Sequence, residues 1–172
     1  MKKQFIIIAA VLLVASGCAT VQSIIKSTFP YTSSLIVPAS SGTNTTLSAT
    51  SSASSFDQIF GNQNGADYIK EVRVASARIE SSNPSNQNLG AFKSIKLYIS
   101  NGSGEVIVAS RTDISENVGN SLVLDIDNSR FVDQYIKGTN VRMRMEYVLR
   151  SGLTTDVSVR AAVNFNSAPN TQ

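Results

Sequence analysis

Histidine and tryptophan are absent from this chain of 172 residues, and cysteine occurs once. Without histidine, a Ser-His-Asp triad, a Cys-His dyad and a histidine-ligated metal site are all excluded. A single cysteine forms no intrachain disulfide and supplies no zinc or iron–sulfur site. The composition therefore argues against an enzyme and predicts no cofactor, although it leaves carboxylate catalysis open.

Charge is also scarce. Charged residues make up 16% of the chain, against about 25% in an average soluble domain, and 26 Ser, 12 Thr and 14 Asn take their place. The formal net charge is +3, but Lys2 and Lys3 belong to a segment that processing would remove. The remaining basic residues are spread along the chain rather than clustered, so we expect no nucleic-acid partner.

The first 18 residues, MKKQFIIIAAVLLVASGC, have the organisation of an export signal. Two lysines precede an apolar run over residues 5–14, and small residues lead to Cys18. The run is too short to cross a bilayer as a helix, which takes about 20 residues. A charged start, a short apolar centre and a small-residue exit are typical of a secretory signal peptide.

The stretch Ala15-Ser16-Gly17-Cys18 resembles the lipobox of bacterial lipoprotein signals, with Ala15 where leucine is commonest. The resemblance implies that a diacylglyceryl group is attached to the Cys18 thiol and that cleavage precedes Cys18. Together with further acylation, for example by palmitate, this would anchor the protein stably in a membrane. Ala19, in place of the aspartate that retains lipoproteins in the inner membrane, favours the outer membrane, on either its periplasmic or its surface face. The alternatives are an ordinary signal peptide with a chance cysteine, or a buried free cysteine.

The full chain divides by composition. We assign residues 1–17 to the signal peptide, 18–30 to a lipid-anchored tether, 31–166 to a folded domain and 167–172 to a polar tail. Residues 31–50 read as one or two strands, although the serine- and threonine-rich run within them is also compatible with a tether. The segment 54–60 predicts a helical turn capped by serine.

From residue 67 onward, apolar and polar residues alternate with the period of β-strands. Near residue 75 the phase slips by one, which predicts a β-bulge. Asn101-Gly102 indicates a hairpin turn, and residues 129–137 predict one short helix. The strands indicated by the alternation are residues 92–99, 106–108, 122–126, 141–149 and 157–165.

The last two strands suggest a hairpin. A five-residue loop, Ser151 to Thr155, keeps the apolar residues of both strands on one face. It also places Glu146 opposite Arg160 and Arg150 opposite Asp156, whereas a three-residue loop would place two arginines opposite each other. With seven to nine short strands and no long helix, the sequence predicts an all-β fold, an antiparallel β-sandwich, with an immunoglobulin-like arrangement as one option.

Two side-chain groups are candidate sites. Asp125, Asp127 and Asn128 supply oxygen ligands of the kind calcium takes, or they simply end a strand before a helix. Arg142, Arg144 and Arg150 follow the polar face of one strand and its end. They could bind anionic sugars or phosphate, or form a solvated face that protects the strand from aggregation.

The sequence therefore favours a lipid-anchored envelope protein with a non-catalytic binding or structural module. Its expected partners are the membrane, through Cys18, and an envelope protein or glycan. One alternative is a glycan-directed hydrolase that uses two carboxylates. Another is a subunit of an envelope assembly, for which an exposed, uncharged strand edge within residues 31–50 would be the sign.

Overall fold

Residues 28–61 and 64–170 are described by a computed structural model. The segment 1–17, Cys18 and most of the expected tether lie outside these residues. No helix in the described part of the chain is long and apolar enough to cross a membrane.

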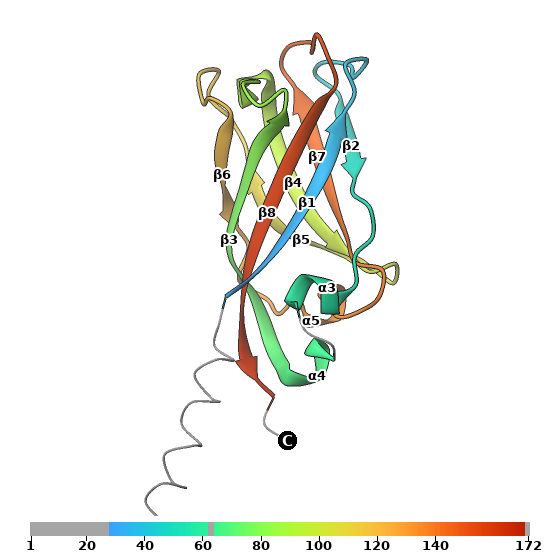
Figure 1. The fold of residues 1–172 in the computed structure, drawn as a ribbon. Helices are drawn as coiled ribbons and strands as arrows, with labels where there is room; N and C mark the ends of the chain where they lie inside the picture. Colours follow the sequence, from blue (N-terminus) through green and yellow to red (C-terminus); the bar gives the residue numbers. More distant parts are fainter. Residues whose placement is uncertain (1–27, 62–63, 171–172) are drawn as a thin grey trace, which may run out of the picture.

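Eight strands dominate the structure (Figure 1). They are β1 (Phe29–Val37), β2 (Thr46–Thr50), β3 (Ile69–Asn83), β4 (Phe92–Ser100), β5 (Glu105–Arg111), β6 (Ser121–Ile126), β7 (Arg142–Leu149) and β8 (Val157–Pro169). Short helical segments connect them: α3 (Phe56–Phe60), α4 (Gly65–Tyr68), the 3-10 turn η1 (Leu89–Ala91) and α5 (Asp133–Ile136).

All strand pairs are antiparallel, in the order β1-β8-β3-β6-β5-β4-β7-β2. Strand β1 pairs with β8, β2 with β7, β3 with β6 and β4 with β5, as in one long ribbon folded back on itself. Between β5 and β6 only two residue pairs form, so β1-β8-β3-β6 and β5-β4-β7-β2 are two four-stranded halves. This nested order is that of a jelly roll. It confirms the all-β antiparallel prediction, with a strand order different from the immunoglobulin-like option.

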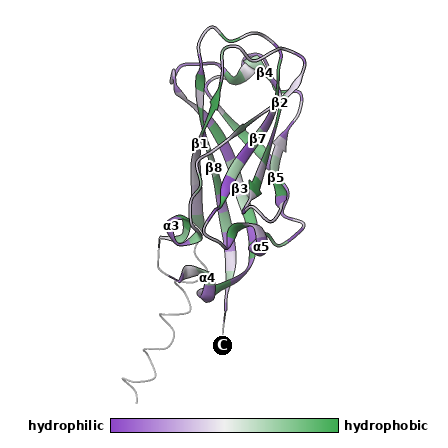
Figure 2. Ribbon diagram, turned by 90° about the vertical axis from the view of Figure 1, so that its right-hand side faces the viewer, coloured by the Kyte–Doolittle hydropathy of each residue, from purple (hydrophilic) through white to green (hydrophobic). Residues whose placement is uncertain are grey.

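The core lies between the two halves. Hydrophobic and hydrophilic residues alternate along the strands (Figure 2), because successive side chains of a strand point to opposite faces. On β7 and β8 the predicted inward residues are buried, among them Met143, Met145, Val159 and Val163. The predicted period-2 pattern of these strands is confirmed.

The predicted hairpin between β7 and β8 is wrong. Strand β7 pairs with β4 and β2, whereas β8 pairs with β1 and β3, so residues 150–156 cross from one half to the other. The charge pairs form within each half instead. Glu146 lies 3.3 Å from Lys96, and Arg160 lies 2.8 Å from Glu80.

Several local predictions are confirmed. The register of β3 against β8 shifts between Val74 and Ser76, as the phase slip indicated. Ser55 caps α3, and its hydroxyl accepts a hydrogen bond from the Gln58 amide. Strands β4 and β5 form the hairpin around Asn101 and Gly102.

Three boundaries differ from the prediction. Strand β1 begins at Phe29, two residues before the expected domain, because the Phe29 ring packs against Phe56 and Phe165. Strand β8 continues to Pro169, beyond the expected end at residue 166. Helix α5 is shorter than residues 129–137, because the Asp127 carboxylate accepts hydrogen bonds from Ser129 and holds that part of the chain in a turn.

Candidate functional site

The elongated fold has two different ends (Figure 1). The start of β1, helices α3, α4 and α5 and the end of β8 lie at the end drawn lowest, called here the lower end. The upper end is formed by four loops that connect β1 to β2, β3 to β4, β5 to β6 and β7 to β8. These loops lie farthest from the point where the chain joins the folded domain.

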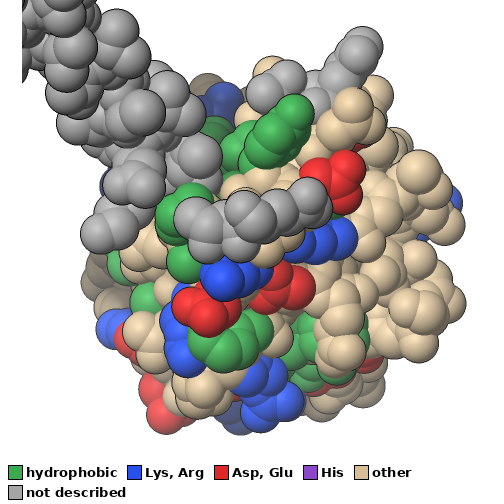
Figure 3. Space-filling model, turned by 90° about the horizontal axis from the view of Figure 1, so that it is seen from below, with side chains coloured by type: hydrophobic (Ala, Val, Ile, Leu, Met, Phe, Trp, Pro, Cys, Tyr) green, Lys and Arg blue, Asp and Glu red, His purple; other side chains and the backbone are tan. Residues whose placement is uncertain are grey.

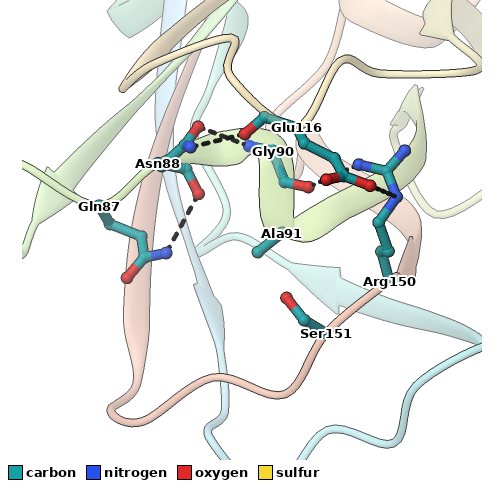
Figure 4. Close-up of a pocket in the computed structure, with 7 residues that line it drawn as sticks. All are labelled: Gln87, Asn88, Gly90, Ala91, Glu116, Arg150 and Ser151. Atoms are coloured by element: carbon teal, nitrogen blue, oxygen red, sulfur yellow. Dashed lines mark hydrogen bonds and ion pairs between the residues drawn. The ribbon is translucent and has the colours of Figure 1, made fainter.

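A hollow of about 440 Å³ opens at the upper end (Figure 4). Three of the loops contribute to it, and five of its seven lining residues have polar side chains. The lining residues are Gln87, Asn88, Gly90, Ala91, Glu116, Arg150 and Ser151.

Asn88 joins two of these loops. Its Oδ1 accepts hydrogen bonds from the backbone amides of Gly90 (2.9 Å) and Gly119 (3.1 Å). Its Nδ2 donates to the carbonyl oxygen of Glu116 (2.6 Å). All these partners are backbone groups, so Asn88 holds the β3–β4 loop against the β5–β6 loop.

Arg150 connects the third loop, between β7 and β8, to the other two. Its guanidinium donates to the carbonyl oxygens of Gly90 (2.9 Å) and Ile114 (2.7 Å) and lies 3.7 Å from a Glu116 carboxylate oxygen. The sequence marked Arg150 as a ligand-binding candidate, whereas the structure uses its guanidinium to fix the loops. The hollow is therefore held in shape in advance, which lowers the entropic cost of binding.

The other candidate arginines lie elsewhere on β7. Arg144 makes two hydrogen bonds to the Glu105 carboxylate, of 2.9 and 2.7 Å, and stacks over the Tyr98 ring. These bonds lower the pKa of Glu105, against the opposing effect of partial burial, and they raise the pKa of Arg144. Arg142 is exposed, and its nearest polar partners are Asn140 and the Ser51 carbonyl.

The three arginines do not form one anion site. Arg142 begins β7 and Arg150 follows its last residue, so they lie about 26 Å apart at the usual rise of a strand. Each has a different set of partners, as given above.

The acidic candidates are also engaged by the protein. Asp125 forms an ion pair with Arg111 at 3.1 Å. The hydroxyl and amide of Ser129 donate to Asp127 and hold its pKa below the ordinary value. Asn128 contributes its backbone carbonyl to Arg73. Within residues 28–61 and 64–170, no cluster of three or more metal-ligating side chains occurs.

Two further hollows lie towards the lower end, and sequence reasoning missed both. One, of about 310 Å³, lies between β1 and α3 and is lined by Pro30, Tyr31, Thr32, Ser54, Gln58 and Ile59. The other, of about 360 Å³, is lined by Glu71, Arg73, Val74, Asn128, Phe131, Asn166 and Ser167. Figure 3 looks onto this end and shows hydrophobic, basic and acidic side chains interspersed.

No family model matches the chain, and no curated protein matches it. Among solved structures, it is similar to one of Desmodium yellow mottle tymovirus, with a TM-score of 0.31 and 8% identity over 85% of this chain and 89% of that one. A structure of the empty head of turnip yellow mosaic virus gives a TM-score of 0.20 and 8% identity over 85% of this chain and 84% of the other. The fold is therefore assigned from the strand order of this chain itself.

Proposed function

We propose that this chain is a lipid-anchored bacterial envelope protein whose jelly-roll domain acts by binding or as a structural module. The observation that carries the proposal is the Ala15-Ser16-Gly17-Cys18 sequence directly after a short apolar run. Cys18 precedes Thr28, the first described residue, by ten residues. Such a segment reaches at most about 36 Å when fully extended, so an acylated Cys18 would keep the domain close to the membrane.

The arrangement of the two ends supports a binding role. Because β1 begins at the lower end, an anchor on the chain that precedes it leaves the upper loops free to face away from the membrane (Figure 1). The hollow around Arg150, with Gln87, Glu116 and Ser151 at its rim, is then available to an envelope protein or glycan. We place the protein at the outer membrane because residue 19 is alanine, rather than the aspartate that retains lipoproteins in the inner membrane.

The alternative of a carboxylate-dependent glycan hydrolase has less support. Glycoside hydrolysis uses two carboxyl groups about 5 to 10 Å apart on either side of the scissile bond. Of the three hollows described above, the first contains Glu116, the second contains no carboxylate and the third contains Glu71. A binding or structural role therefore agrees better with the distribution of acidic residues in these hollows.

Fatty-acid labelling tests the anchor. In a bacterial host, the wild-type chain should incorporate radiolabelled palmitate, and Cys18→Ser should abolish the label. In an enterobacterial host, Ala19→Asp should retain the label but move the protein to the inner-membrane fraction, whereas Ala19→Ser should leave it in the outer membrane. A wild-type chain that takes up no label would show that the anchoring proposal is wrong.

A second candidate role, as a subunit of an envelope assembly, is favoured by one observation. Strands β1 and β2 end the sheet order and contain no charged residue, whereas exposed strand edges are usually protected by charge. Ile36 of β1 is 60% exposed. A strand from another chain could pair with the free edge of β1 or with that of β2.

Chemical cross-linking in membranes distinguishes the two roles. An assembly through the β1 edge should give cross-linked oligomers of the wild type, and Thr32→Lys should remove them. Val123→Lys places the same charge on β6, away from either free edge, and should leave them intact. A wild type recovered only as a monomer would rule out the assembly role.

A further inference from the structure

The 360 Å³ hollow at the lower end is built from three separate segments. Glu71 and Arg73 come from the start of β3, Asn128 and Phe131 from the connection between β6 and α5, and Asn166 from the end of β8. Its volume lies within the range of roughly 300–1,000 Å³ of small-molecule sites. No part of the function proposed above uses these residues.

Glu71 has a strained backbone. Its φ of 56° lies in the left-handed region, which three other non-glycine residues of the described chain, Asn44, Asn64 and Asp113, also adopt. Asparagine and aspartate are enriched in this region, whereas glutamate is not. The strain coincides with a register shift of β3 between Lys70 and Arg73, and such bulges often redirect a side chain at a binding site.

Phe131 presents an aromatic surface at the same place. It is 46% exposed, one of few large apolar side chains that the described structure leaves in contact with solvent. The Arg73 guanidinium lies 4.0 Å from the centre of its ring and donates a 2.7 Å hydrogen bond to the Asn128 carbonyl. The ring is therefore held in position before any ligand binds.

Apart from Val74, the remaining lining residues are polar, and their charges balance. They include one carboxylate, Glu71, one guanidinium, Arg73, and the carboxamides of Asn128 and Asn166. The buried Oγ of Ser167 has no hydrogen-bond partner among the described residues. A hollow with an aromatic wall, several hydrogen-bonding groups and no net charge suits a neutral ligand that has both an apolar face and several hydroxyl groups.

We propose that this hollow binds the pyranose ring of a neutral sugar. The C–H face of the ring packs on Phe131, and the sugar hydroxyls donate to the Glu71 carboxylate and exchange hydrogen bonds with the Asn128 and Asn166 carboxamides. The inference rests on the binding role proposed above and not on the lipid anchor. It places a second binding site at the end opposite the upper hollow.

Sugar titrations of the purified full chain in detergent micelles test the proposal. The probes are glucose, galactose, mannose and N-acetylglucosamine, with glucuronic acid and glucosamine as charged comparators, and binding is followed by NMR. At least one neutral sugar should bind with a Kd of about 5 mM or tighter, and the charged comparators should bind more weakly. Phe131→Ala should weaken binding about tenfold or more, while Val123→Ala, at a comparably exposed residue of β6, should leave it unchanged.

The variant Glu71→Gly distinguishes a loss of sugar binding from a loss of stability. Because glycine adopts positive φ freely, this variant should have a higher Tm than the wild type and should nevertheless lose sugar affinity. Asp113→Gly makes the same backbone change in the upper β5–β6 loop and should leave sugar binding intact.

Three results would overturn the inference. One is that no neutral sugar binds the wild type, and another is that sugar binding survives Phe131→Ala. The third is that Phe131→Ala weakens association of the Cys18→Ser chain with sugar-free phosphatidylcholine vesicles, which would assign the aromatic ring to a membrane contact. None of these results bears on palmitate incorporation at Cys18, so failure of the sugar site and failure of the anchor are distinguishable. If a sugar binds, the affinity for the free oligosaccharide is compared with the affinity for the same sugar on glycolipid vesicles. The tighter of the two shows whether the ligand is a free glycan or a glycolipid headgroup.

Discussion

Gly90 lies where two loops of the upper end pack tightly against each other. A Cβ atom at this position would lie 1.9 Å from the carbonyl oxygen of Glu116, and the obstacle is backbone rather than a movable side chain. Both polar groups of Gly90 are also used, since its amide donates to Asn88 and its carbonyl accepts from Arg150. The upper hollow therefore depends on one glycine as much as on its polar side chains.

Gly90→Ala should destabilise the protein by about 2 kcal/mol or more, because the two loops must separate and several of these hydrogen bonds must stretch. Urea denaturation measures the change in the free energy of unfolding. Gly152→Ala is the matched control. Its Cβ would meet no atom within 4 Å, so its effect should stay within about 0.5 kcal/mol.

The Glu105–Arg144 pair should make stability depend on pH. Because the folded-state pKa of Glu105 is lowered by its hydrogen bonds to Arg144, its contribution is present above the unfolded-state pKa of about 4.3 and disappears as the pH falls through the folded-state pKa. Glu105→Gln should cost about 0.5–1 kcal/mol at pH 7, and this difference from wild type should shrink in acid. Denaturation series between neutral pH and pH 3 measure it, and a difference that does not change with pH would contradict the assignment.

Residue-scale roles were only partly predictable from the sequence. The alternation of residues 141–149 identifies Arg144 as a polar-face residue, but its partner Glu105 comes from another strand. Arg150 was expected to be available to a ligand, whereas the carbonyls that bind it belong to Gly90 and Ile114. Phe131 stands in a polar segment, and nothing in the sequence brings Glu71 and Asn166 beside it.

At the scale of strands, alternation predicts that a segment is a strand but does not identify its neighbour. Any two strands that each have one apolar face can be aligned with those faces on the same side of a sheet. The sequences of β7 and β8 therefore fit a hairpin, although the two strands are not paired. The charge argument failed for the same reason. Glu146 finds Lys96 and Arg160 finds Glu80, so several pairings satisfy the same charges. Only the local features, the bulge near residue 75, the Ser55 cap and the Asn101-Gly102 turn, could be predicted in detail.

Engineered disulfides test the strand order. Glu80 and Arg160 are direct partners of β3 and β8, and the Cα atoms of such partners lie about 4.5–5.5 Å apart, within disulfide range. In a Cys18→Ser background, Glu80→Cys with Arg160→Cys should form a disulfide under mild oxidation. Glu146→Cys with Arg160→Cys, the pair that the hairpin would have required, should remain reduced.

At the scale of the whole molecule, β1 closes the structure. It pairs with β8, with Phe29 opposite Phe165, so residues far apart in sequence must meet before the core is complete. Because forming such a long loop costs entropy before its contacts are made, we expect β1 to dock late in folding.

Leu35→Ala tests this order of events. Leu35 is fully buried on β1, so its truncation should lower the free energy of unfolding by about 2–5 kcal/mol. If β1 docks late, most of the change should appear as faster unfolding rather than slower folding. Stopped-flow kinetics measure both rates, and Ile36→Ala, at the exposed neighbour, should change neither greatly. A lower stability that arose mainly from slower folding would contradict late docking.

The contact between Thr28 and Asn166 has a practical consequence. The Thr28 hydroxyl donates to the Asn166 side chain at 2.9 Å, so the start of the folded domain touches its last strand. A short peptide could join the two, and the chain could then be opened at an upper loop such as residues 150–156. Such a circular permutant would retain every strand pair and carry its new termini at the opposite end of the domain.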